Sequence, residues 1–154
     1  MLTIHEQVDV KTPIAEAFAY VADLRNLPQW NPSSQRAELL GDELIGVGDR
    51  FAVDVLFRSR TTAWVYEIVE CERPSRIVLR GACGRRSAID EIELRTIEHG
   101  TRIDYRATFS PPPWLWPLQI FVRPAVRRLG RDVAAGLRSR LGDASPASEP
   151  VEDA

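Results

Sequence analysis

A chain of 154 residues with 44% hydrophobic and 27% charged residues has the size and composition of one globular domain that folds without metal or disulfide support. Its formal net charge of -2 predicts neither nucleic-acid binding nor affinity for acidic ligands, and we expect no nucleic-acid partner. The sequence shows no signal-peptide pattern, no membrane-length apolar run, and only two cysteines, Cys71 and Cys83, without metal-ligand spacing. We therefore expect a cytoplasmic protein with reduced cysteines, no metal and no cofactor.

The N-terminal stretch alternates between apolar and polar residues, which is typical of a half-buried strand. Leu2, Ile4, Val8 and Val10 share one face of this predicted strand. Glu6 falls on the same face, so the pattern directs a carboxylate toward the interior of the protein or its rim.

Two short helical segments are predicted next. Thr12-Pro13 indicates the start of the first, with a threonine N-cap and a proline at the first helical position. Pro28 and Pro32 end the second, and Asp23 is suited either to cap it or to hold the adjacent loop.

From residue 35 to residue 109 the hydrophobic period is two nearly throughout, which predicts six further strands. Short turns rich in glycine, proline and aspartate separate them, so they form an antiparallel meander. The predicted strands are 35–40, 50–58, 61–72, 76–82, 87–97 and 101–109.

The last predicted element is a long amphipathic helix between Pro111 and Gly142. Pro117 fits a first helical turn, whereas Pro124 is expected to break or kink the helix. Residues 143–154 are rich in alanine, serine, proline and acidic residues, and are predicted to be a disordered tail after a single domain of residues 1–142. The helix carries one apolar stripe, made of Val126, Leu129, Val133, Leu137 and Leu141.

This order of elements predicts a cavity. A long meander twists and curls, and one helix covers its concave face only along a stripe. The short helices near residues 13–27 close one end, which leaves an internal space of the kind that small ligands occupy.

The element order, a strand, two short helices, six strands and a long helix, resembles the α+β helix-grip fold. The chain is similar to the superfamily of START lipid-transfer domains, pollen allergens and bacterial polyketide cyclase/dehydrase-like proteins, often called SRPBCC proteins. The resemblance covers about residues 2–142 and implies a curved sheet of about seven strands gripping the helix around a ligand cavity. The motifs that carry it are Val8 through Phe18, Asp23 through Pro32, Gly46 through Phe51, Asp90-Glu91-Ile92, Gly100 through Tyr105 and Gly136-Leu137-Arg138.

Strand parity and the helix stripe predict an aromatic and aliphatic cavity that suits a flat or hydrophobic small molecule. The predicted lining residues are Glu6, Trp30, Phe51, Val53, Val55, Phe57, Trp64, Tyr66, Leu79, Asp90, Ile92, Tyr105, Leu129 and Val133.

Asp90 is the sharpest candidate for a functional group, because a carboxyl group on the concave face is poorly solvated and its pKa rises. The alternative is that Asp90 pairs with an arginine such as Arg80 or Arg58, and Glu6 likewise either forms a salt bridge at the rim or lies in the cavity. Trp30 either plugs the structure or lines the entrance of the cavity.

Recognisable catalytic sets are missing from the sequence. His5 is predicted on the outer face of the first strand and His99 in a turn, so we expect neither to act as a base. The candidate catalytic residues are Asp90, Tyr66 and Tyr105.

The segment from Trp114 to Phe121 is apolar, and arginines follow it from Arg123 to Arg140. It either packs on the sheet with the arginines in solvent, or contacts an anionic lipid surface or a partner. We expect a monomer or a homodimer.

Three functions fit these features. The first is a carrier or sensor for a hydrophobic small molecule, lipid or polyketide-like, without catalysis. The second is a polyketide cyclase or dehydratase that uses Asp90, Tyr66 and Tyr105 for acid-base chemistry. The third is a partner-binding domain that uses the segment from Trp114 to Phe121.

Overall fold

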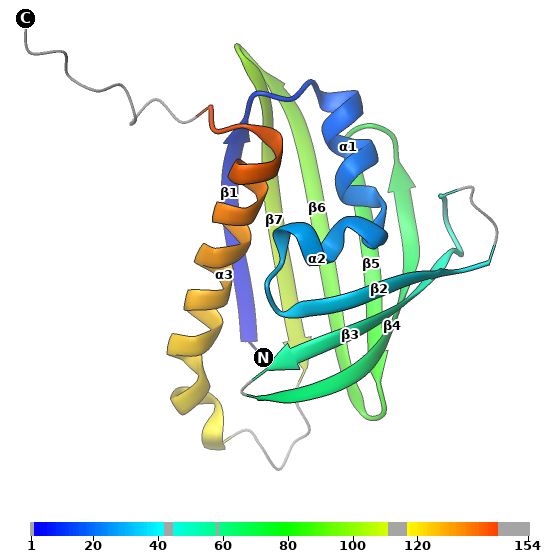
Figure 1. The fold of residues 1–154 in the computed structure, drawn as a ribbon, viewed down its shortest axis with the longest axis vertical. Helices are drawn as coiled ribbons and strands as arrows, with labels where there is room; N and C mark the ends of the chain where they lie inside the picture. The colour runs from blue at the N-terminus through cyan, green and yellow to red at the C-terminus, as the bar shows by residue number, and fades with distance from the viewer. Residues whose placement is uncertain (1, 42–44, 58, 111–116, 145–154) are drawn as a thin grey trace, which may run out of the picture.

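The computed structural model of the chain describes residues 2–41, 45–57, 59–110 and 117–144. One seven-stranded sheet has the order β1-β7-β6-β5-β4-β3-β2, and all its neighbouring strands are antiparallel (Figure 1). The strands are β1 (Leu2–Val10), β2 (Ser34–Leu40), β3 (Arg50–Phe57), β4 (Arg60–Glu72), β5 (Arg76–Cys83), β6 (Arg86–Ile97) and β7 (Gly100–Ser110). The helices are α1 (Ile14–Ala22), the 3-10 helix η1 (Leu24–Asn26), α2 (Leu27–Trp30) and α3 (Gln119–Leu141). The predicted α+β helix-grip architecture and its meander are thus confirmed.

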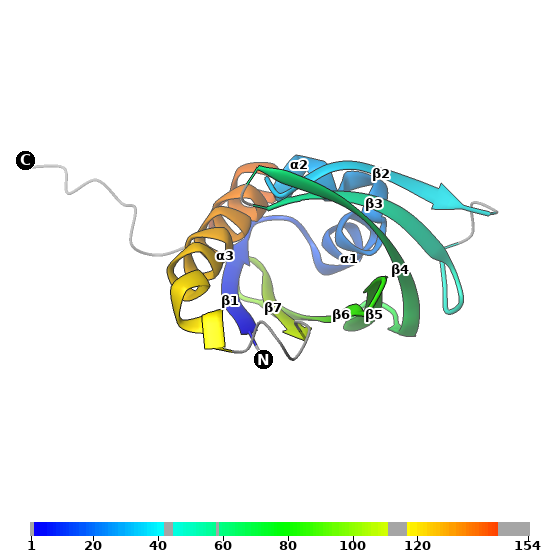
Figure 2. The same cartoon turned by 90° about the horizontal axis from the view of Figure 1, so that it is seen from below.

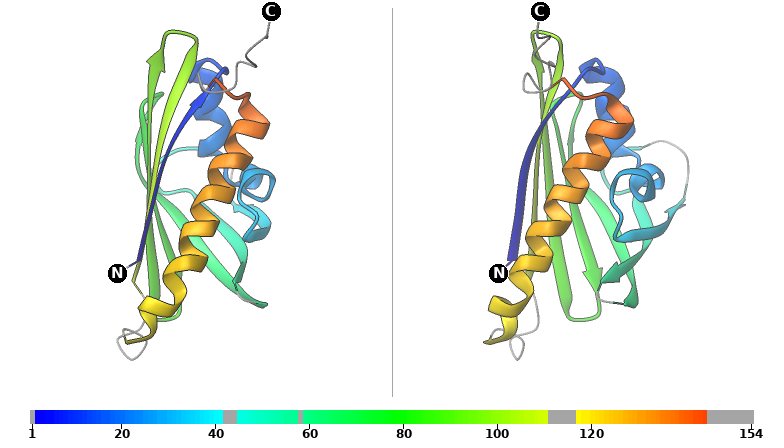
Figure 3. Two further views of the ribbon diagram at one scale, coloured as in Figure 1. Left: turned by 90° about the vertical axis from the view of Figure 1, so that its left-hand side faces the viewer. Right: turned by 60° about the vertical axis from the view of Figure 1, so that its left-hand side comes forward.

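The sheet curls so that β1 and β2, its two edges, approach the same side of the molecule, and α3 fills the space between them (Figures 2 and 3). α3 packs along β1 and against α2, and α1 covers part of β6 and β7. The concave face carries the apolar side chains of each strand, as the period of two requires. Phe51 and Val53 on β3 are buried, whereas Ala52 and Asp54 between and after them are partly exposed.

The C-terminal end of α3 is tied to the end of β1. The Thr12 hydroxyl donates to the Leu141 carbonyl oxygen at 2.7 Å, and Lys11 N–H donates to the Gly142 carbonyl at 2.9 Å. The predicted Thr12 cap is therefore wrong: α1 begins at Ile14 without a side-chain cap, and the Thr12 hydroxyl bonds to the far helix instead.

The first residues of the predicted tail belong to this joint. Asp143 forms an isolated bridge with Val10, and Ala144 N–H donates to the Asp9 carbonyl at 3.0 Å. The rest of the predicted tail, residues 145–154, lies outside the described residues.

Pro124 lies inside α3, and the helix continues through it, so the predicted break is wrong. A proline within a helix leaves the carbonyl of the residue four positions earlier without its usual partner. That residue is Ile120, which is 65% exposed, so water can satisfy its carbonyl group. Among the described residues, no helix is both long and apolar enough to cross a membrane.

Candidate functional site

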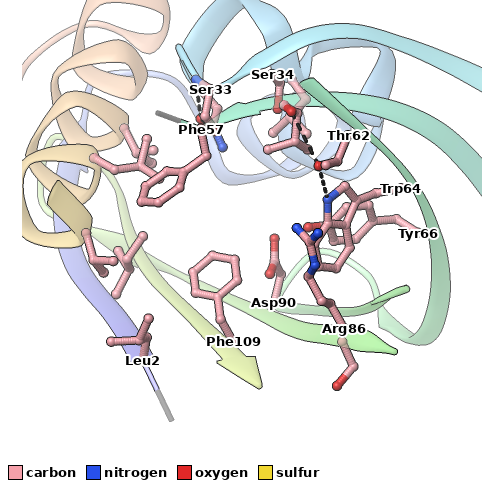
Figure 4. A pocket seen from close by; sticks show the side chains of 18 of the residues that line it. Leu2, Ser33, Ser34, Phe57, Thr62, Trp64, Tyr66, Arg86, Asp90 and Phe109 are labelled. Atoms are coloured by element: carbon pink, nitrogen blue, oxygen red, sulfur yellow. Dashed lines mark hydrogen bonds between the residues drawn. The ribbon is translucent and has the colours of Figure 1, made fainter. Parts of the chain in front are cut away.

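A cavity of about 210 Å³ lies between the concave face of the sheet and α3. It lies beside Phe57 at the end of β3, Arg86 at the start of β6 and Phe109 near the end of β7 (Figure 4). Its wall is mostly apolar, with serines and one arginine, Arg86, among its polar members. The lining residues are Leu2, Ile4, Leu27, Asn31, Ser33, Ser34, Val55, Phe57, Thr62, Trp64, Tyr66, Arg86, Ser87, Asp90, Tyr105, Phe109, Ser110, Val126, Leu129 and Val133.

Strand parity explains how one face of the sheet supplies most of this wall. Trp64 and Tyr66 are two residues apart on β4, so both point to the concave face, where their rings stack with centroids 6.1 Å apart. Tyr105 and Phe109 on β7 follow the same rule. The helix adds Val126, Leu129 and Val133, at spacings that keep them on one side of α3.

Asp90 is the acidic residue of the cavity wall, and its carboxyl group points from β6 into the cavity (Figure 4). The Tyr105 hydroxyl donates to its Oδ2 at 3.1 Å. Its Oδ1 is buried and has no hydrogen-bond partner among the described residues. A carboxylate oxygen in this position is poorly solvated and only half satisfied.

Burial is the main cause of the raised pKa of the Asp90 carboxyl group. Loss of solvation raises the pKa of its carboxyl group to about 7, although the hydrogen bond from Tyr105 works in the opposite direction. The pKa of Tyr66 and that of Tyr105 are both raised well above the usual value, first by burial and then by the nearby negative charge of Asp90. Both phenols therefore stay protonated at neutral pH and remain hydrogen-bond donors.

A glycine makes room for Tyr66 beside this carboxyl group. Gly81 on β5 pairs with Tyr66 on one side and with Ala88 on β6 on the other. A Cβ atom at position 81 would lie 2.6 Å from the Tyr66 ring, so the ring lies directly over the strand. Glycine within a strand often marks such a close approach.

The structure brings part of the predicted set together at the cavity: Val55, Phe57, Trp64, Tyr66, Asp90, Tyr105, Leu129 and Val133. The remaining predicted residues, Glu6, Trp30, Phe51, Val53, Leu79 and Ile92, do not lie on its wall. The apolar members of the second group are fully or almost fully buried within the hydrophobic core.

Trp30 and Glu6 pack against neighbouring elements and do not lie on the cavity wall. The Trp30 ring packs edge-on against Tyr105, a residue of the cavity wall, with ring centroids 5.9 Å apart. Glu6 lies under α3, where a Cβ added at Gly130 would come within 3.0 Å of its Oε1.

We expected as an alternative that Asp90 pairs with an arginine, but among the described residues it forms no such pair. Its hydrogen bond comes from Tyr105, Arg80 is exposed, and Arg58 lies outside the described residues. Asp23 caps η1 by accepting the N–H of Arg25 at 3.1 Å.

The histidines lie away from the cavity wall. His5 is bonded to Asp104 at 2.9 Å on the outer side of the sheet, and His99 is exposed in the turn before β7. Among the described residues, no group of histidine, cysteine, aspartate and glutamate side chains has the arrangement of a metal site.

Several lining residues were missed by the sequence reasoning. Asn31, Ser33 and Ser34 come from the connection between α2 and β2, where no periodicity indicates which way a side chain points. Phe109 and Leu2, in contrast, share parity with predicted cavity or core residues, and that signal was sufficient to find them.

The N-terminal turns of α3 leave apolar side chains in solvent. Leu118, Ile120 and Phe121, which we call the apolar turn, are 50%, 65% and 71% exposed. Trp114, Leu115 and Trp116 of the predicted patch lie outside the described residues.

Comparisons with known proteins agree with this architecture. The family model described as polyketide cyclase/dehydrase and lipid transport matches residues 1–142. No curated protein matches the sequence.

Solved structures share the fold at low sequence identity. A protein from Thermus thermophilus, TTHA0849, superposes with a TM-score of 0.75 at 15% identity, over 90% of this chain and 96% of that one. A START superfamily protein from Mycobacterium smegmatis gives 0.73 at 15% identity, over 90% and 96%. The ZhuI aromatase/cyclase from Streptomyces sp. R1128 gives 0.71 at 13% identity, over 90% and 92%.

Proposed function

The chain belongs to the polyketide cyclase/dehydrase and lipid transport family, and from this premise we propose that it binds and carries a hydrophobic small molecule in the cavity between the sheet and α3. The observation that carries the proposal is the mostly apolar wall of the cavity of about 210 Å³. An apolar cavity of about 150 Å³ is enough to hold benzene. The cavity therefore suits a molecule of one or two rings, or the end of a longer chain.

The aromatic part of the wall favours a flat ligand. Trp64 and Tyr66 form a stacked pair on one side, and Phe109 lies across the cavity from them (Figure 4). Rings prefer offset or edge-on contacts with other rings, which aliphatic walls do not provide.

Native mass spectrometry of the protein purified from its own host tests the proposal. The expected result is a bound small molecule in the wild type and its loss in Leu129→Trp, which fills the cavity from α3. Ala135→Trp is the matched control, because position 135 is exposed on the same helix. The absence of any bound molecule, together with no rise in melting temperature from a library of lipids and aromatic compounds, would overturn the proposal.

A specific observation favours catalysis as the second candidate function. Asp90, with a pKa of about 7, is poised to accept or donate a proton at neutral pH, and Tyr105 and Tyr66 are protonated donors beside it. In a cyclase or dehydratase, the cavity would fold a polyketide-like chain while Asp90 removes and returns a proton.

Substitution of Asp90 separates the two functions. If the protein is an enzyme, Asp90→Asn lowers turnover of a polyketide-like chain by about 100-fold or more, since that is the usual contribution of a general acid or base. Unchanged turnover in Asp90→Asn would remove this candidate and leave the carrier function in place.

The exposed apolar turn gives a carrier a place to meet lipid. Leu118, Ile120 and Phe121 protrude from the same helix that contributes Val126 and Leu129 to the cavity wall. Exposed arginines follow at positions 123, 127 and 128. An apolar segment beside basic residues suits an anionic lipid surface, and we propose that ligand exchange takes place there.

A further inference from the structure

We propose that Asp90 determines ligand specificity, and that the ligand is a flat molecule of one or two rings with a hydroxyl group that donates a hydrogen bond to Asp90 Oδ1. This inference rests on the proposed binding function, because it names the chemistry of the molecule that the cavity takes. Its starting point is the buried carboxyl oxygen that has no partner among the described residues.

The position of Asp90 shows why the missing partner is expected to be a ligand. On β6, Asp90 pairs with Leu79 on one side and with Ala107 on the other, and neither neighbour offers a side-chain donor. Tyr105 reaches Oδ2 only. A buried acceptor left without a donor is costly, and proteins rarely retain one without a use for it.

The oxygen is within reach of a ligand. Asp90 forms part of the cavity wall and its carboxyl group points into the cavity (Figure 4). Oδ1 itself is covered, but the terminal torsion of an aspartate is soft. In the proposed complex the carboxyl group turns about this torsion, so that Oδ1 meets the ligand hydroxyl group.

The surroundings select a neutral hydroxyl group over an ammonium group. An ammonium group brings three donors into the cavity, whereas Asp90 has one unpaired oxygen. The phenols of Tyr66 and Tyr105 are protonated, and the proton of Tyr105 is already directed at Asp90. A hydroxyl group brings one donor, which matches the one unpaired oxygen of Asp90, and it avoids the cost of placing a charged group in a mostly apolar cavity.

The rings beside Asp90 select a flat molecule. Trp64 and Tyr66 stand next to the carboxyl group as a stacked pair, and the Tyr66 ring lies over Gly81. A ligand ring that contacts this pair holds its hydroxyl substituent against β6, where Asp90 lies.

A pair of matched probes tests the inference: 2-naphthol and 2-methylnaphthalene, which differ by a hydroxyl group in place of a methyl group. Dissociation constants are measured by ¹H–¹⁵N NMR titration at about pH 8, where most of Asp90, with its pKa of about 7, is ionised. We expect the wild type to bind 2-naphthol at least about tenfold more tightly, because a hydrogen bond to a charged group contributes that much.

Two variants assign the preference to Asp90. Asp90→Leu is expected to bind the two probes about equally. Asp90→Asn, which keeps a carbonyl oxygen and a partner for Tyr105, is expected to retain a preference of a few-fold. The control Asp54→Asn, on the opposite face of β3, keeps the wild-type ratio.

The outcomes separate this inference from the binding function itself. Equal affinity of the wild type for both probes, or a wild-type preference that persists in both Asp90 variants, overturns the role of Asp90 while the cavity still binds ligand. Failure of the wild type to bind either probe overturns the flat-ring ligand proposed here, whereas the binding function itself is overturned only if native mass spectrometry and the ligand library also find no bound molecule.

Discussion

Tyr105 on β7 donates its hydroxyl proton to Asp90 on β6 at 3.1 Å, although the two residues are not opposite each other in the sheet. Ala107 is the register partner of Asp90, and Tyr105 lies two residues before Ala107 on β7, opposite Ile92. The small side chain at position 107 leaves the diagonal path open, so the phenol reaches across to the carboxyl group. One donor stabilises the charged form, but burial outweighs it and the pKa of Asp90 stays near 7.

Removal of this donor is expected to raise the pKa of Asp90 further. A hydrogen bond contributes about 0.5–1.5 kcal/mol, and one pKa unit corresponds to about 1.4 kcal/mol, so Tyr105→Phe raises the value by roughly one unit. The ¹³C chemical shift of the Asp90 carboxyl group, followed through a pH titration, measures the change. Tyr20→Phe, whose hydroxyl bonds to Gln29 instead, is the control. A lower or unchanged pKa in Tyr105→Phe would contradict the assigned hydrogen bond.

The raised pKa of Asp90 makes stability fall as the pH rises. Between the usual pKa of 3.8 and the folded value of about 7, the folded state binds the Asp90 proton more tightly than the unfolded state. Stability is therefore lost across this window, by roughly 2–4 kcal/mol in total, since the site is largely but not completely buried. Asp90→Asn does not titrate, so it is expected to gain this amount relative to the wild type as the pH rises from about 4 to about 7.

Guanidinium unfolding at several pH values measures the gain, and the difference between wild type and variant removes the contribution of other groups. The cavity wall also carries Arg86 and the phenols of Tyr66 and Tyr105, and because the pKa values of both phenols are raised, neither phenol titrates in this window. Asp54→Asn should show no comparable gain. A constant difference between Asp90→Asn and the wild type across the window would show that Asp90 titrates normally.

The sequence was sufficient for the sheet because its strands follow a period of two nearly throughout and are separated by short turns. Parity also put Asp90 and Tyr105 on the concave face. It did not show that they meet, because their contact depends on the register of β6 against β7 and on a diagonal side-chain path. Gly81 within a predicted strand was a signal of close approach, but the identity of the approaching ring again required the register.

The hydrophobic pattern of the sequence does not indicate the surroundings of Trp30 or of Pro124. Trp30 lies at the end of α2, and the sequence left open whether it lines the cavity or plugs the structure. The structure resolves this through its tertiary contacts with Tyr105 and with α3. At Pro124 the proline rule predicted a break or a kink, and the helix does not break there, in a turn of α3 whose residue Ile120 is exposed.

Two glycines of α3 are expected to respond differently to alanine. A Cβ atom at Gly136 would collide with the backbone of Trp30 in α2, which cannot move aside without shifting the helix. At Gly130 the added atom would meet the side chains of Glu6 and Ile4 at 3.0 Å, and Glu6 is free to rotate away. Alanine favours a helix over glycine by about 1 kcal/mol, so Gly130→Ala is expected to be near neutral. Gly136→Ala is expected to destabilise the fold by roughly 1–3 kcal/mol, because overpacking exceeds the gain in helix propensity. Urea unfolding compares the two, and equal effects would contradict the close packing of α3 on α2.

The apolar turn of α3 predicts binding to anionic vesicles. Phe121 is 71% exposed, and burying such a ring in a bilayer interface contributes about 1.5–3 kcal/mol. Phe121→Ser should therefore weaken cosedimentation with phosphatidylglycerol vesicles by about tenfold or more. Ile89→Ser is the matched control, since Ile89 is also exposed, at 45%, but lies on β6 away from the apolar turn.

Binding should also weaken with added salt and with phosphatidylcholine in place of phosphatidylglycerol, because the arginines that follow Phe121 contribute through charge. If the wild type binds neither kind of vesicle, and instead forms a dimer that Phe121→Ser dissociates, the apolar turn binds a second copy of the chain and not a lipid surface.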